Sequence, residues 1–195
     1  MSTNSLVAIL NKDNSVVSSY VHYDGYATGV GEMLLEHYNS EERARDLAWC
    51  LGYASSLKET ISESHEDRAN SDEAVTYESY DEFEEMIRDS SYLEYVYVWD
   101  CHEDRWMVAS WETTRKSSGN YEDHGFEFES HWNGFEDLVK VYVREGHATV
   151  RRYRNMVAEK RVGVEYLDHA SELETLVTKW NECYWEEVAR EALAA

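Results

Sequence analysis

Residues 16–38, VVSSYVHYDGYATGVGEMLLEHY, constrain the fold most, because two different periodicities meet there across a group of glycines. The first eight residues alternate in polarity and are rich in β-branched and aromatic side chains, which is typical of a strand. The Asp-Gly pair at 24–25 predicts a turn. Gly-Val-Gly at 29–31 then opens a helix with one apolar face. The segment therefore predicts a strand–turn–helix unit.

Residues 6–10 read as a strand and 11–15 as a turn, so the first two strands are expected to form a hairpin. Ser40 is a candidate N-cap for a second helix, which Gly52 can end. The polar residues 59–72 are expected to form a loop.

Residues 80–87 predict a short amphipathic helix, and 95–99 predict a strand whose hairpin partner is 105–111. A short edge strand is expected at 126–129. The residues beyond 134 read as helical, with a long amphipathic helix at 170–193. We therefore expect an α+β fold, a small antiparallel sheet with packed helices followed by a mainly helical C-terminal part. The expected divisions are an α/β domain at 1–112, a linker or edge segment at 113–129, and the helical part at 130–195.

The chain has 195 residues, with 40 Asp and Glu against 18 Lys and Arg, and a formal net charge of −22. Phosphates repel a chain this acidic, so we expect no direct nucleic-acid binding, and partners with basic surfaces instead. Acidity that serves only solubility, or adaptation to a salty cytoplasm, is the alternative. No export signal and no apolar run of membrane-spanning length are read in the sequence, and three widely spaced cysteines favour a reducing cytoplasm.

The negative charge is concentrated between residues 59 and 104, where 16 acidic residues and two arginines give 2 − 16 = −14. Carboxylates on a helix beside acidic loops approximate the charge density of duplex DNA. We therefore expect a partner-binding acidic surface, with a merely solvated face as the alternative. The candidate residues are Asp72, Glu73, Glu78, Asp81, Glu82, Glu84, Glu85, Asp89, Glu103 and Asp104.

Other candidate sites are weaker. Gly29 and Gly31 are a candidate anion or nucleotide loop, although the third glycine of a dinucleotide loop and the Lys-Ser/Thr of a P-loop are absent, so a tight turn is favoured. His22 and Asp24, with His37 nearby, could bind a metal or act together as a catalytic base, but they do not complete a recognisable ligand set. Asp24 is expected to fix the turn instead. We expect no catalytic residues, no metal and no cofactor.

The C-terminal half is locally basic, since residues 140–161 contain seven Lys and Arg and two Glu, or 7 − 2 = +5. This segment is expected to dock on the chain's own acidic part or to join two subunits, so a homodimer through the C-terminal helices is one option. Trp180 and Tyr184 are expected in the core and Trp185 at an interface. Cys50 and Cys183 are expected to pack within their helices.

The segments H-x-D-G-Y-x-x-G-V-G at 22–31, Leu34-Leu35 followed by His37-Tyr38, and L-G-x-x-S-S-L at 51–57 resemble a family of small uncharacterised phage and prophage proteins. Residues 83–108 are similar to that family's acidic helix, aromatic strand and Trp-bearing hairpin. The resemblance covers residues 16–110 and departs at Ala27, Thr28 and Tyr53. It implies a phage gene product acting in the cytoplasm of a bacterial host, and it implies no reaction.

Charge and resemblance together predict a non-enzymatic phage inhibitor. It would bind a host nucleic-acid-handling protein, such as a defence nuclease, a CRISPR effector or a polymerase, through an acidic surface that mimics nucleic acid. The alternatives are a sponge for a nucleotide signal, which would use the glycine turn and Tyr or Trp stacking, and an acidic interaction protein without mimicry.

Overall fold

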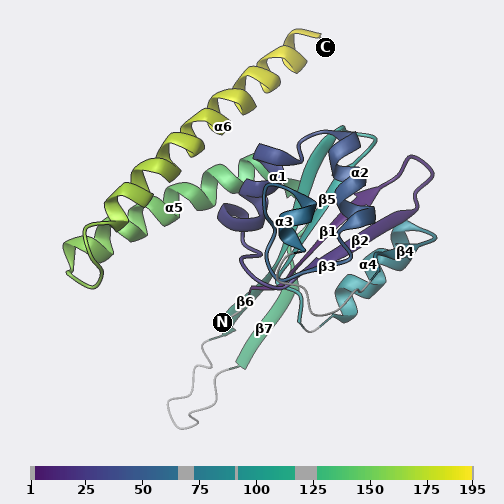
Figure 1. Ribbon diagram of the computed structural model, residues 1–195, viewed down its shortest axis with the longest axis horizontal. Helices are drawn as coiled ribbons and strands as arrows, with labels where there is room; N and C mark the ends of the chain where they lie inside the picture. Colours follow the sequence, from purple (N-terminus) through teal and green to yellow (C-terminus); the bar gives the residue numbers. More distant parts are fainter. Residues whose placement is uncertain (1–2, 66–72, 91, 117–126, 195) are drawn as a thin grey trace.

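The computed structural model describes residues 3–65, 73–90, 92–116 and 127–194. Within these ranges the strands form one sheet in the order β3-β2-β1-β5-β6-β7, with β4 also paired to β2 and β8 to β6 (Figure 1). The strands are β1 (Ser5–Leu10), β2 (Val16–Val21), β3 (Tyr53–Ala54), β4 (Val75–Tyr77), β5 (Tyr95–Asp100), β6 (Arg105–Lys116), β7 (Glu127–Trp132) and β8 (Glu136–Asp137). The helices are the short π-helix η1 (Ala27–Gly31), α1 (Glu32–His37), α2 (Glu41–Cys50), α3 (Ile61–Ser64), α4 (Tyr80–Asp89), α5 (Leu138–Ala158) and α6 (Tyr166–Ala194).

The sheet confirms the expected α+β class, and its pairing is mixed rather than purely antiparallel. β1 and β2 form the predicted hairpin, and β5 pairs antiparallel with β6. The pairs β1–β5 and β2–β3 are parallel, however. A parallel pair requires a crossover connection, and the helices and loops between β2 and β5 supply it.

Helices cover both faces of the sheet. Adjacent strand residues point to opposite faces, so neighbouring residues of one strand belong to different core clusters. Val7 and Ile9 belong to a core cluster that also contains buried residues of α1, α2, α5 and α6. Leu6 and Ala8 belong to a second cluster, which contains Phe83 and Ile87 of α4. We call these the α1/α2 face and the α4 face.

The strand–turn–helix unit forms as predicted, with β2 followed by η1 and α1. The left-handed residue of the turn is Asp24, with φ of 59°, rather than Gly25. Gly29 is required by close packing, because an added Cβ would lie 2.2 Å from the Asp24 carbonyl oxygen. From β5 the buried Tyr97 hydroxyl donates to the Gly25 carbonyl oxygen at 2.7 Å, which ties the turn to the centre of the sheet.

The predicted helix ends are also present. The Ser40 hydroxyl accepts from the Arg43 N–H at the start of α2, and Gly52, with φ of 63°, follows its end. The expected loop at 59–72 contains the short helix α3, held by a capping box between Thr60 and Glu63. Residues 66–72 lie outside the described residues.

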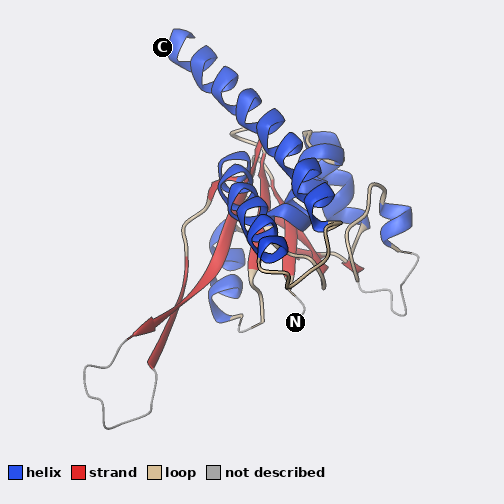
Figure 2. Cartoon of the chain, turned by 90° about the vertical axis from the view of Figure 1, so that its left-hand side faces the viewer, coloured by secondary structure: helices blue, strands red, loops and turns tan. Residues whose placement is uncertain are grey.

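The expected boundary at residue 112 falls inside β6, which runs on to Lys116 and pairs with β7. The Trp111 and Trp132 rings meet edge to face across this pair, with centroids 5.3 Å apart. The hairpin projects away from the rest of the sheet (Figure 2). Strand structure therefore occupies both ends of the segment expected as a linker.

The C-terminal helices pack on the α1/α2 face and share its core. α5 continues through Gly146, and its residues Leu138 and Tyr142 are fully buried there. Gly146 allows a close approach of α6, because an added Cβ would lie 2.3 Å from Val177 Cγ2. The far end of α6 extends beyond the body of the protein (Figures 1 and 2).

Candidate interaction surface

The helix α4 carries five of the ten predicted acidic residues, and its sequence separates an apolar side from a charged one. The Ser79 hydroxyl accepts from the Glu82 N–H at 3.2 Å and caps the helix. Phe83 and Ile87, four residues apart, are buried against the sheet, and the Phe83 ring meets Tyr77 at 5.2 Å. The carboxylates consequently occupy the outward side.

Most of the predicted acidic residues are exposed. Glu84 is half-buried and pairs with Arg88 at 2.9 Å, and Glu82 accepts from the Glu78 N–H at 2.8 Å. Asp72 lies outside the described residues. The exposed members are Glu73, Glu78, Asp81, Glu82, Glu85, Asp89, Glu103 and Asp104.

Asp100, at the end of β5, adds charge near the start of α4. Burial, together with the smaller effects of the Glu84 and Asp100 charges, raises the pKa of Tyr80 to about 12, so Asp100 acts on the first turn of α4. Glu103 pairs with Arg105 at 3.4 Å, which offsets part of the charge in the turn.

The structure does not bring the whole acidic stretch together. Ile61 of α3 packs on the α1/α2 face, whereas α4 covers the opposite side of the sheet. Glu59 precedes α3 and Glu63 lies within it, and both line a cavity of about 600 Å³ with Asp24 and Glu32. The stretch at 59–104 therefore contributes to two separate surfaces, of which the α4 surface holds the larger number of candidate residues.

A second cavity, of about 440 Å³, opens beside α4 and is lined mainly by aromatic and apolar side chains. The Tyr20 and Tyr53 rings stack with centroids 5.5 Å apart and planes at 28°. The Tyr92 ring stands edge-on to Tyr20 at 6.1 Å. We call this the tyrosine pocket. No pattern in the sequence indicated it. Its residues come from β2, β3, β4, α4 and the segment before β5, so only the sheet order brings them together.

The glycine turn offers little to an anion. The N–H groups of Gly29 and Gly31 donate to the Tyr26 carbonyl oxygen at 2.9 and 3.4 Å, and the Val30 N–H donates to the Asp24 carbonyl oxygen at 2.8 Å. Among the described residues that line the cavity beside the turn, four are carboxylates and one is a lysine. These contacts match the tight-turn interpretation.

The three residues weighed as metal ligands take part in different contacts. The His22 Nδ1 lies 3.1 Å from the Tyr20 hydroxyl, and Asp24 accepts from the Tyr26 hydroxyl at 3.2 Å. The His37 carbonyl oxygen accepts from the Arg43 guanidinium. Among the described residues, no group of three His, Cys, Asp or Glu is placed to hold a metal ion.

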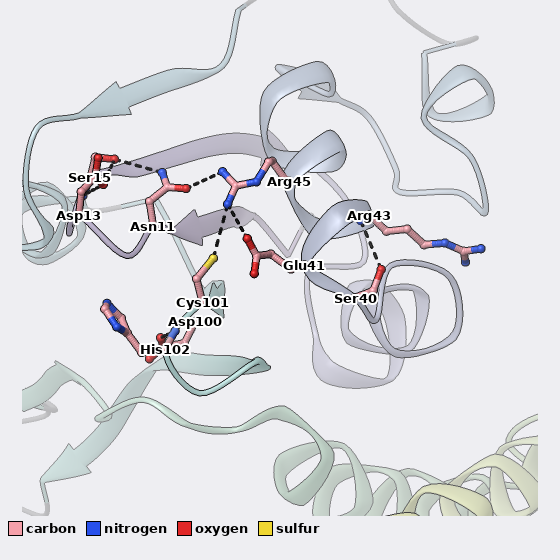
Figure 3. A network of polar contacts seen from close by, with 10 residues as sticks. All are labelled: Asn11, Asp13, Ser15, Ser40, Glu41, Arg43, Arg45, Asp100, Cys101 and His102. Carbon is pink, nitrogen blue, oxygen red and sulfur yellow. Dashed lines mark hydrogen bonds and ion pairs between the residues drawn. The ribbon is translucent and has the colours of Figure 1, made fainter.

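A polar network joins the ends of β1 and β5 to α2 (Figure 3). Arg45 donates to Asn11 Oδ1 at 2.6 Å and to Glu41 Oε1 at 2.9 Å, and its Nη2 lies 3.8 Å from Cys101 Sγ. Burial, more than the nearby Glu41 charge, raises the pKa of the Cys101 thiol, although Arg45 acts to lower it. Protonated and buried, this thiol is suited to packing rather than to nucleophilic chemistry.

The other two cysteines were expected to pack, and that expectation is wrong. Cys50 and Cys183 are exposed, because each falls on the solvent side of its helix. On α6, Trp180 is half-buried and packs against the core, as expected. Tyr184, also expected in the core, is half-buried but belongs to neither core cluster, and Trp185 is 60% exposed.

The basic segment of α5 makes an ion pair with α6, and not with the described residues of the acidic stretch at 59–104 on which it was expected to dock. Arg154 pairs with Glu174 of α6 at 2.6 Å, which holds the helical hairpin together. Arg151 and Arg152 remain exposed. A second ion pair, from Lys179 to Glu36 at 2.8 Å, joins α6 to α1.

Comparisons of the chain with protein-family models, with curated proteins and with solved structures found no match. The resemblance to phage proteins therefore stays a prediction from the sequence. In the parts of the chain that the structure describes, no helix has the length and apolarity needed to cross a bilayer.

Proposed function

We propose that the protein is a non-enzymatic phage inhibitor that acts in the host cytoplasm. It binds a nucleic-acid-handling protein of the host, such as a defence nuclease, a CRISPR effector or a polymerase, through the exposed side of α4. The observation that carries this proposal is the separation of the two sides of α4. Phe83 and Ile87 on its apolar side are buried against the sheet, and its outward side presents carboxylates.

The charge spacing on α4 supports mimicry of nucleic acid. Asp81, Glu82, Glu84, Glu85 and Asp89 lie on a helix of 10 residues, which is about 15 Å long at 1.5 Å per residue. This gives one carboxylate per about 3 Å of axis, against about 3.4 Å per phosphate along one DNA strand. A groove that binds phosphates would therefore meet a comparable charge density on this helix.

The alternatives differ in what they require. An acidic interaction protein without mimicry would use the same helix but would not compete with nucleic acid. A nucleotide sponge that used the glycine turn would need donors and positive charge there, whereas the turn amides bond to carbonyl groups and carboxylates line the cavity. We therefore favour the protein-binding role.

The proposal is tested by comparing two variants of equal charge. In the α4 variant, four exposed carboxylates that make none of the side-chain contacts described above become amides: Glu78→Gln, Asp81→Asn, Glu85→Gln and Asp89→Asn. The control variant carries the same number of changes on exposed positions of α6: Glu172→Gln, Glu182→Gln, Glu186→Gln and Glu187→Gln. Each variant has a net charge of −22 + 4 = −18.

Immobilised wild-type protein and both variants are incubated with host lysate, and captured proteins are identified by mass spectrometry. We expect a nucleic-acid-binding protein on the wild type and the α6 control, and its loss from the α4 variant. With the purified target, four contacts of about 0.2–1 kcal/mol each predict an affinity loss between about fourfold and several-hundredfold. DNA or RNA should compete with the wild type, and salt should weaken binding. Equal capture by all three proteins would refute the proposal.

A further inference from the structure

The tyrosine pocket has a chemistry that selects among ligands. Its aromatic wall is set by strand pairing, because β3 pairs with β2 in the register Tyr20↔Tyr53 and so places these rings side by side. Tyr92 is fixed from the other direction, since Asn4 Nδ2 donates to its carbonyl oxygen at 3.1 Å. The wall therefore exists in the folded chain before any ligand arrives.

The electrostatics of the pocket favour a cation. An aromatic ring presents a negative face, and cations bind over it. Among the described residues that line the cavity, Glu73 carries the one carboxylate, and none is Lys, Arg or His. Burial raises the pKa of Tyr20 to about 12, with Tyr53 and Tyr92 adding to the effect, so the Tyr20 hydroxyl is uncharged at pH 7 and can accept a hydrogen bond. In the described part of the lining, a phosphate-bearing ligand would therefore meet a carboxylate and aromatic rings but no cationic side chain.

The position of the pocket connects it to α4. Met86 lines the cavity, and helix periodicity places Glu82 and Asp89, four residues before and three after it, on neighbouring positions of the same side. Tyr77, which also lines the pocket, contacts Phe83 beneath α4. A basic segment lying along α4 would therefore pass the mouth of the pocket.

We propose that the tyrosine pocket binds the guanidinium group of an arginine side chain from the partner protein, with the planar group stacked on an open ring face of the Tyr20, Tyr53 and Tyr92 cluster and its charge facing Glu73. Arginine fits better than lysine, because a planar guanidinium stacks on an aromatic face and is less strongly hydrated than an ammonium. This inference rests on the proposed function, since it names the anchor residue of the same partner. The cavity volume of about 440 Å³ exceeds what a single side chain needs and lies within the usual range for ligand sites.

The test uses Nα-acetyl-arginine amide as the probe and its citrulline analogue as the matched control, because citrulline replaces the guanidinium with an uncharged urea of the same shape. Protein labelled with ¹³C in the tyrosine rings is titrated with each compound to tens of millimolar and followed by NMR. We expect saturable shifts of Tyr53 and Tyr92 with the arginine compound, and weaker ones with the lysine analogue. Equal shifts with citrulline, or larger shifts with adenosine monophosphate, would overturn the proposal.

Variants then locate the site. Tyr53→Leu, Tyr92→Leu and Glu73→Gln should each weaken binding about two- to fivefold, the size of one exposed cation–π or ion-pair contact. Tyr23→Leu is the control, because Tyr23 is 47% exposed but does not line the cavity, and it should leave binding unchanged. If all three pocket variants bind the arginine compound as well as the wild type does, the assignment of the site is refuted. If one variant folds poorly, the comparison of the arginine compound with citrulline still tests the proposal, because it uses the wild-type protein.

The two proposals fail separately. If the arginine compound does not bind but partner capture still depends on α4, the pocket assignment is wrong and the function stands. If the compound binds as described but capture does not depend on the α4 carboxylates, the pocket assignment stands and the proposed function is wrong.

Discussion

The contact between Gly146 of α5 and Val177 of α6 predicts that Gly146→Ala destabilises the protein when residue 177 is valine and stabilises it when residue 177 is alanine. Alanine in place of a mid-helix glycine stabilises the helix by about 1 kcal/mol. At this site, however, the new Cβ would lie 2.3 Å from Val177 Cγ2, and overpacking of a buried site costs about 1–3 kcal/mol. We therefore expect Gly146→Ala alone to lower the free energy of unfolding by about 0–2 kcal/mol.

Removing the two methyl groups of Val177 should reverse the sign of the effect of Gly146→Ala on the free energy of unfolding. Val177→Ala alone should cost about 2 kcal/mol, from two lost methyl groups and the cavity they leave. In that background the nearest remaining atom of residue 177 is its Cβ, 3.6 Å away, which is ordinary contact. Gly146→Ala should then stabilise the protein by about 1 kcal/mol. The coupling free energy between the two changes is therefore about 1–3 kcal/mol.

Urea unfolding of the four proteins, followed by circular dichroism, measures this cycle. Ala148→Gly is the control, because Ala148 is exposed on the same helix. It should cost about 1 kcal/mol in both backgrounds. Equal effects of Gly146→Ala with and without Val177 would refute the close packing of α5 on α6.

Two further predictions concern ionisable groups. Burial raises the pKa of Glu145, so the folded state binds the proton of this carboxyl group more tightly than the unfolded chain does. The stability that results is present below the usual carboxyl pKa range and is lost as the pH rises through the raised pKa. The stability of Glu145→Gln, measured by thermal unfolding relative to wild type, should therefore be more favourable at pH 7 than at pH 4, and a difference of the opposite sign would contradict the assigned cause. Cys50 and Cys183 are exposed and Cys101 is buried, so a thiol reagent should react rapidly with two thiols per chain and with the third only in denaturant. Rapid reaction of all three would contradict the burial of Cys101.

Local signals in the sequence were sufficient for most of the secondary structure. The alternation in β2, the cap at Ser40 and the spacing of Phe83 and Ile87 each depend on neighbouring residues, and each element formed where it was expected. The parallel pairing of β1 with β5 depends instead on residues about 90 positions apart, and no short-range pattern encodes it. The length of β6 was underestimated because a strand with polar residues resembles a polar linker.

The candidate site divides in the same way. The carboxylates of α4 were found because they are consecutive in sequence, whereas the tyrosine pocket requires Tyr20, Tyr53 and Tyr92 to be gathered from distant segments. The separation of Glu59 and Glu63 from α4 was missed for a related reason. Charge along a chain does not report which side of a sheet the chain occupies.

The contacts of α5 with the glycine turn affect the order in which the protein can be completed during translation. From α5, the Tyr142 hydroxyl donates to Glu32 Oε2 at 2.8 Å, directly after η1, and Leu138 lies against Gly31. The turn near the amino terminus thus acquires its final partners only after more than a hundred further residues have been synthesised. A nascent chain that stops before α5 leaves Gly31 and Glu32 without these partners, so ribosome-bound intermediates of different lengths should become resistant to protease around residues 16–38 only once α5 has emerged.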